Sequence, residues 1–137
     1  LKVYGFASTI ARNEDLDDTT LQIVDMAAVL HDIGIPVSEE KHNSSAGKYQ
    51  EIEGPPIARE MLLDLGVEKE QIDRVCYLIG NHHTYSKIDG IDFQILVEAD
   101  FLVNIFEDEI NKKTLPGIRE KYFKTETGEM LLDSIYL

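Results

Sequence analysis

The chain of 137 residues is long enough to bury one sizeable hydrophobic core but not two. Its 26 acidic and 13 basic residues give a formal net charge of −13, which opposes binding to nucleic acid and to anionic membranes. One cysteine cannot form an internal disulfide, and no apolar run approaches the roughly 18 residues of a membrane span. We therefore expect one cytoplasmic domain, residues 1–137, with no nucleic-acid or membrane partner. A homo-oligomer is compatible with the sequence, which leaves the oligomeric state open.

Apolar residues recur at helical spacing along most of the chain, and no convincing strand pattern interrupts them. The predicted helices cover 1–12, 17–32, 55–66, 69–83 and 92–106, and weaker helical patterns follow a break at 115–117. The polar segment 37–54 is predicted to be a surface loop. The first helix enters the sequence already in progress, so we expect further residues upstream. The pattern predicts an all-α, compact, single-domain bundle of about six helices.

Two of the predicted helices end with pairs of polar side chains that are common metal ligands. His31 and Asp32 follow one inward apolar stripe, and His82 and His83 follow another at an equivalent helical phase. The two stripes consist of Leu21, Val24 and Ala28 in one helix and of Ile72, Val75 and Ile79 in the other. Both pairs can therefore reach the core side of the last helical turn.

A third ligand-type side chain, Asp100, lies within the most apolar predicted helix. It shares a face with Phe93, Leu96 and Val103. An unpaired carboxylate there would be buried at a cost of several kcal/mol, so a cation or strong donor is expected beside it. Imidazole and carboxylate together suit a divalent transition metal. The alternative is a structural ion pair between Asp100 and either Arg12 or Arg59.

The run His31-Asp32-Ile33-Gly34 resembles the doublet that names the HD-domain superfamily of metal-dependent phosphohydrolases, and Asp100 matches the distant aspartate of that family. The resemblance covers nearly the whole chain. It implies a helical HD-domain fold in which His31, Asp32 and Asp100 bind a divalent metal ion. Manganese, iron, cobalt, nickel, magnesium and zinc all suit such ligands, and the sequence does not choose among them.

The resemblance also implies an activity: hydrolysis of a nucleotide or other small phosphate ester, as a phosphomonoesterase or phosphodiesterase, through a metal-activated water. Asp32 is then a candidate for proton transfer. His82 and His83 occupy the place where many family members carry histidines that bind a second metal or the substrate phosphate, so His82 is a catalytic candidate and both are substrate-binding candidates. Lys41 and Lys48, in the predicted loop, are candidates for binding the phosphate by position alone.

Two departures from the family pattern bear on these expectations. The first family histidine is expected one turn before Val3, upstream of Leu1. Where two-metal members often carry a further histidine, this chain has Glu53-Gly54-Pro55, which favours one metal unless Glu53 serves a second. The alternative function is a degenerate HD module with a binding or regulatory role and no catalysis. A purely structural bundle would leave Asp100 unexplained.

Overall fold

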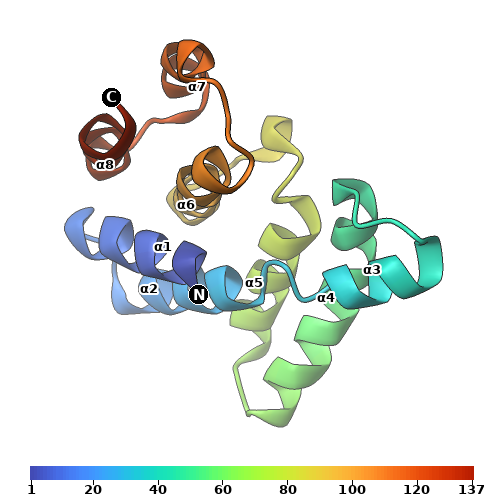
Figure 1. The fold of residues 1–137 in the computed structure, drawn as a ribbon. Coiled ribbons are helices and arrows are strands. Elements are labelled where there is room, and N and C mark those ends of the chain that lie inside the picture. The colour runs from blue at the N-terminus through green and yellow to red at the C-terminus, as the bar shows by residue number, and fades with distance from the viewer.

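The computed structural model describes all residues from 1 to 137 and contains eight α-helices, two short 3₁₀ helices and no strands (Figure 1). The all-α prediction is confirmed, although the helices outnumber the predicted six. The α-helices are α1 (Lys2–Asn13), α2 (Asp18–Leu30), α3 (Ile35–His42), α4 (Gly47–Asp64), α5 (Lys69–Asn81), α6 (Ile91–Glu107), α7 (Leu115–Tyr122) and α8 (Glu126–Tyr136). The 3₁₀ helices are η1 (Tyr85–Lys87) and η2 (Lys112–Thr114).

Helix α6 is the central element of the bundle. It contacts α1, α2 and α8, and in Figure 1 it lies between the α1–α2 pair and the α7–α8 pair. Every residue from Ile95 to Asp100 is buried, so this stretch has no solvent face. Each large apolar side chain buried there contributes about 1.5–3 kcal/mol to folding. The helix that carries Asp100 is therefore firmly held in the core.

The polar pairs predicted at two helix ends lie just beyond the observed ends. Helix α2 begins at a cap in which Asp17 accepts a hydrogen bond from the Thr20 amide at 2.7 Å, and it ends at Leu30. His31 and Asp32 occupy the turn that follows. Helix α5 similarly ends at Asn81, just before His82. Since α2 packs against both α5 and α6, the turns that follow α2 and α5 lie in the same packed part of the bundle.

The prediction of a surface loop over 37–54 is wrong, because α3 and the first part of α4 occupy that segment. Pro55 and Pro56 lie inside α4 rather than in its first turn. Close packing explains the difference. A Cβ on Gly34 would lie 2.7 Å from the Gly54 amide nitrogen, and a Cβ on Gly54 would lie 2.9 Å from Ile79 Cγ2. These glycines let α4 pack tightly between the preceding turn and α5, so tertiary contacts stabilise a helix whose sequence favours a loop.

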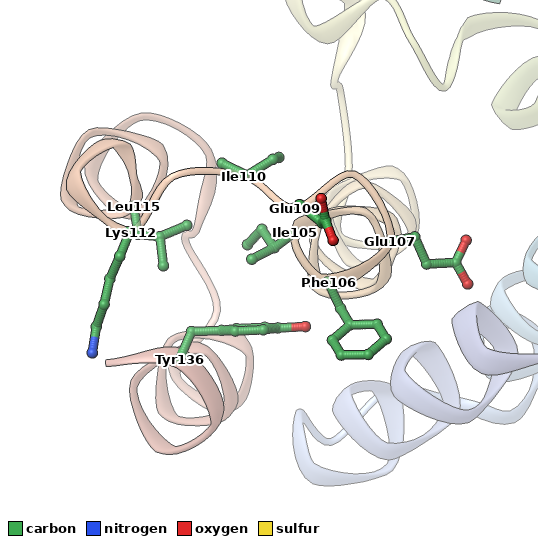
Figure 2. Close-up of a pocket in the computed structure, with 8 residues that line it drawn as sticks. All are labelled: Ile105, Phe106, Glu107, Glu109, Ile110, Lys112, Leu115 and Tyr136. Atoms are coloured by element: carbon green, nitrogen blue, oxygen red, sulfur yellow. The ribbon is translucent and has the colours of Figure 1, made fainter.

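The predicted break at 115–117 is the start of α7, where Pro116 occupies the first turn and needs no amide partner. Helix α8 is then fastened to α6, because the Tyr136 hydroxyl donates to the Leu102 carbonyl. Figure 2 shows Tyr136 reaching from α8 toward Ile105, with Ile110 and Leu115 on the opposite side of a hollow of about 490 Å³.

Taken singly, each helix is too short or too polar to span a membrane, and the bent pair α2–α3 meets both requirements by length and composition only.

Candidate functional site

Two buried histidines meet at the ends of α2 and α5. The rings of His31 and His82 are 5.6 Å apart and nearly perpendicular. Nδ1 of His31 lies 2.7 Å from the Ala28 carbonyl, and Nδ1 of His82 lies 2.6 Å from the Ile79 carbonyl. Because a carbonyl can only accept, each Nδ1 must carry the hydrogen. In the neutral ring, Nε2 therefore presents a lone pair, and both Nε2 atoms are buried without a hydrogen-bond partner.

Two carboxylates face these unpartnered nitrogens. His31 Nε2 lies 3.1 Å from Asp32 Oδ2 and 3.6 Å from Asp100 Oδ1, but neither contact has the geometry of a hydrogen bond. His82 Nε2 lies 3.9 Å from Asp32 Oδ1. Asp100 is buried, with 7% of its surface exposed, whereas half of the Asp32 side chain is accessible. The structure thus brings together four of the side chains that the sequence singles out, and we call them the His–Asp cluster.

The predicted alternative partners of Asp100 lie elsewhere. Arg12 pairs with Asp25 at 3.5 Å, and Arg59 pairs with Asp73 at 2.9 Å. No arginine or lysine forms an ion pair with Asp100, so the structural ion pair considered from the sequence does not exist in this fold. The close electrostatic partner of Asp100 is instead His31, whose Nε2 lies 3.6 Å away.

The two histidines respond to this environment in opposite directions. Burial acts to lower the pKa of His31, but Asp100 and Asp32 outweigh it and raise that pKa to about 10. Burial, followed by the proximity of His83, lowers the pKa of His82 to about 4. For Asp32, burial acts to raise the pKa, yet His31 outweighs it and lowers the pKa below its ordinary value. Without a metal, a proton on His31 therefore supplies the positive charge that the carboxylates require.

The donor set of the cluster fits a divalent cation. Two imidazole nitrogens and two carboxylates form the mixed nitrogen and oxygen shell that transition metals accept. Histidine ligands also commonly donate their other ring N–H to a backbone carbonyl, as both rings do here. In the conformation described, no three histidine, cysteine, aspartate or glutamate side chains surround one point closely enough to hold an ion. Binding of a cation would therefore require the side chains of the His–Asp cluster to move closer together.

Helix α4 contributes two residues that the sequence analysis missed. Gln50 Oε1 lies 3.1 Å from His83 Nε2, and the Glu51 carboxylate accepts bonds from the His83 amide and the Thr84 hydroxyl. Together they fix the turn that follows α5. The signal that could have revealed Gln50 is the helical stripe of buried residues at i, i+4 spacing along α4, whereas Glu51 lies outside this stripe. That stripe consists of Gln50, Gly54, Ala58 and Leu62.

The remaining candidates divide into two groups. Lys41 Nζ and His42 Nε2 both approach the Glu53 carboxylate, at 3.4 and 2.9 Å. Lys41 and Glu53 are thus engaged between α3 and α4, and no contact joins them to the His–Asp cluster. Lys48 lies on the first turn of α4, next to Gly47, where a Cβ would lie 3.0 Å from the His83 ring. Its side chain is exposed, with Nζ 4.9 Å from the centroid of the Tyr49 ring, and no contact joins it to the His–Asp cluster.

The comparisons with known proteins yield one match. The family model described as HD domain matches residues 1–126. No curated protein and no solved structure matches the chain.

The first prediction concerns metal affinity. Asp100→Asn removes a charge without changing the size of the side chain, and we expect it to weaken Mn²⁺ binding by roughly 100-fold. Isothermal titration calorimetry of metal-stripped protein measures this. Asp108→Asn, at the exposed end of the same helix, is the matched control and should bind Mn²⁺ as the unchanged chain does. Equal affinity in both variants would place the metal elsewhere.

The second prediction concerns pH. In the folded protein His31 keeps its proton up to about pH 10, whereas an unfolded histidine loses it near 6.5. The stabilising contribution is complete below pH 6.5 and is lost as the pH rises toward 10. In excess chelator, the free energy of unfolding should therefore fall across this window, as measured by urea titration. His31→Gln should show a shallower fall in the same buffers, and identical slopes would contradict the assignment.

Proposed function

The chain belongs to the HD domain family, and we propose that it is a metal-dependent phosphohydrolase that cleaves a nucleotide or another small phosphate ester. HD domains are generally metal-dependent hydrolases. The observation that carries the proposal is the convergence of two buried, unpartnered Nε2 atoms on the carboxylates of Asp32 and Asp100. A structural cluster would be expected to satisfy those nitrogens with hydrogen bonds, whereas a bound cation would replace the proton that His31 carries in the chain alone and accept the lone pairs of both Nε2 atoms.

All four side chains of the cluster are proposed ligands, and Asp32 is also the proposed proton acceptor. His31, His82, Asp32 and Asp100 would hold the cation. When bound, a divalent cation polarises a phosphoryl oxygen and lowers the pKa of water. The half-exposed Asp32 carboxylate faces both the cluster and solvent, so it is placed to accept a proton from the attacking water.

Residues around the cluster are better candidates than His82 for binding the substrate phosphate. A pKa near 4 leaves His82 neutral at pH 7, and its Nδ1–H is already donated to Ile79. His82 therefore has no free donor for a phosphate oxygen, which favours its role as a ligand. Lys48 is exposed and carries N–H groups that a phosphate can accept, whereas His83 is half-buried and its Nε2 already donates to Gln50 Oε1 at 3.1 Å, so His83 would have to release Gln50 to bind a phosphate.

The third prediction tests catalysis. The protein loaded with Mn²⁺ should hydrolyse members of a panel of phosphomonoesters and phosphodiesters, and chelator should abolish the activity. Asp100→Asn should lower kcat/KM by about 10³-fold, and Asp108→Asn should leave it unchanged. Phosphate release is the measurement. Protein that binds no stoichiometric metal after purification without chelator would instead favour the degenerate HD module.

The fourth prediction tests Lys48. If its ammonium group meets the substrate phosphate, Lys48→Ala should raise KM by about threefold to tenfold with little change in kcat, because the interaction forms on binding. Lys41→Ala should change KM less, since Lys41 already pairs with Glu53. A KM unchanged by Lys48→Ala for every substrate of the panel would remove Lys48 from the site.

A further inference from the structure

A hollow of about 550 Å³ lies between η1 and the segment that joins α7 to α8. Its walls include Tyr85, Ser86 and Gln94 on one side and Lys121, Tyr122 and Lys124 on the other. We call it the lysine hollow. It adjoins the His–Asp cluster through Tyr85, whose ring packs 5.4 Å from that of Phe101, the residue after Asp100.

The charge of the lysine hollow is unusual for this protein. Lys121 and Lys124 form no ion pair, although Lys124 Nζ donates to the Glu120 carbonyl at 2.8 Å, and no aspartate or glutamate lines the hollow, while the chain carries a net charge of −13. Four other hollows, of about 340 to 490 Å³, each contain at least one carboxylate. The one in Figure 2, for example, is lined by Glu107 on α6 and Glu109 just after it, with Lys112 on the opposite side. An anion approaching this acidic molecule therefore finds locally positive walls in the lysine hollow.

Hydrogen bonds from α6 hold the backbone of the lysine hollow in place. The fully buried Glu98 carboxylate accepts the amides of Lys124 and Thr125, at 2.9 and 3.0 Å, and the Thr125 hydroxyl. Gln94 donates to the Tyr122 carbonyl at 2.7 Å. Glu98 and Gln94 both belong to α6, the helix that carries the buried carboxylate of the His–Asp cluster. The backbone that bears the lysines is thus fixed relative to the cluster.

Tyr85 stands between the two regions as a hydrogen-bond donor. Burial, with Asp100 as the next cause, raises the pKa of Tyr85 to about 12, so its hydroxyl keeps its proton at neutral pH. Gln94 Oε1 and the Ser86 hydroxyl make no hydrogen bond within the chain and are free for a ligand. The lysine hollow therefore offers cations, neutral donors and an acceptor on one concave surface.

We propose that the lysine hollow binds a second anionic group of the substrate. The substrate is then a phosphate ester that carries another phosphate or a carboxylate, held by Lys121 and Lys124 while the first phosphate reaches the His–Asp cluster. The assignment of the first phosphate rests on the proposed function. Anion binding by the lysine hollow does not, and the two can be tested separately.

Binding without metal tests the lysine hollow by itself. Metal-stripped protein in low salt is titrated with 1,4-butanediol bisphosphate by calorimetry. Lys121→Ala/Lys124→Ala should weaken binding by about tenfold or more. The matched control, Lys112→Ala/Lys113→Ala, removes two exposed, unpaired lysines from η2 and should change the affinity less than about twofold. No binding by the unchanged protein, or equal loss in both variants, would overturn the proposal.

Turnover tests the link to the His–Asp cluster. With Mn²⁺ bound, kcat/KM is compared for 1,2-ethanediol to 1,6-hexanediol bisphosphates and for the matching monophosphates. We expect at least one bisphosphate to be preferred by about tenfold, and Lys121→Ala/Lys124→Ala alone to remove the preference. Hydrolysis without such a preference would overturn the proposal. Lysine-dependent binding without any hydrolysis would instead reject the phosphohydrolase function and retain the lysine hollow as an anion site.

Discussion

The structure depends on a polar cluster that the apolar core cannot neutralise. Asp100 is held inside the most buried helix, and its neighbours are imidazole rings whose inner nitrogens lack hydrogen-bond partners. Burial of such groups is costly unless a positive charge accompanies them. In the chain alone, a proton on His31 provides that charge, and a divalent cation would provide it more completely. The cluster thus holds one positive charge in the chain alone, and a divalent cation that replaced the His31 proton would neutralise both carboxylates.

Helix α6 positions both the His–Asp cluster and the proposed anion site. Its buried face holds Asp100 against the turns that end α2 and α5. One half-turn earlier, Glu98 fastens the segment between α7 and α8. The same rigid element therefore positions both the His–Asp cluster and the lysine hollow. Such shared support limits relative motion, which is what precise placement of a two-ended substrate needs.

Helix α4 supports the cluster from its other side. Gln50 and Glu51 hold His83 and Thr84, so the turn beyond α5 cannot easily move away from the site. Glu53, two residues later, points to α3 instead and pairs with Lys41 and His42. The two glutamates differ because a helix turns by about 100° per residue, which places Glu51 and Glu53 on different faces.

The sequence by itself determined the all-α class and the bounds of α1, α2, α5 and α6 to within about two residues, because apolar periodicity is a local signal. It also predicted Asp100 as a site residue from its buried charge, and His31 and Asp32 from their resemblance to the HD doublet. It did not determine that 37–54 is helical. That outcome depends on Gly34 and Gly54, which permit close packing between segments distant in sequence. The tertiary structure also decided that His82 joins the cluster and that Lys121 and Lys124 share a hollow with Tyr85. Such contacts follow from how helices pack, and helical periodicity specifies which face is buried but not which residue it meets.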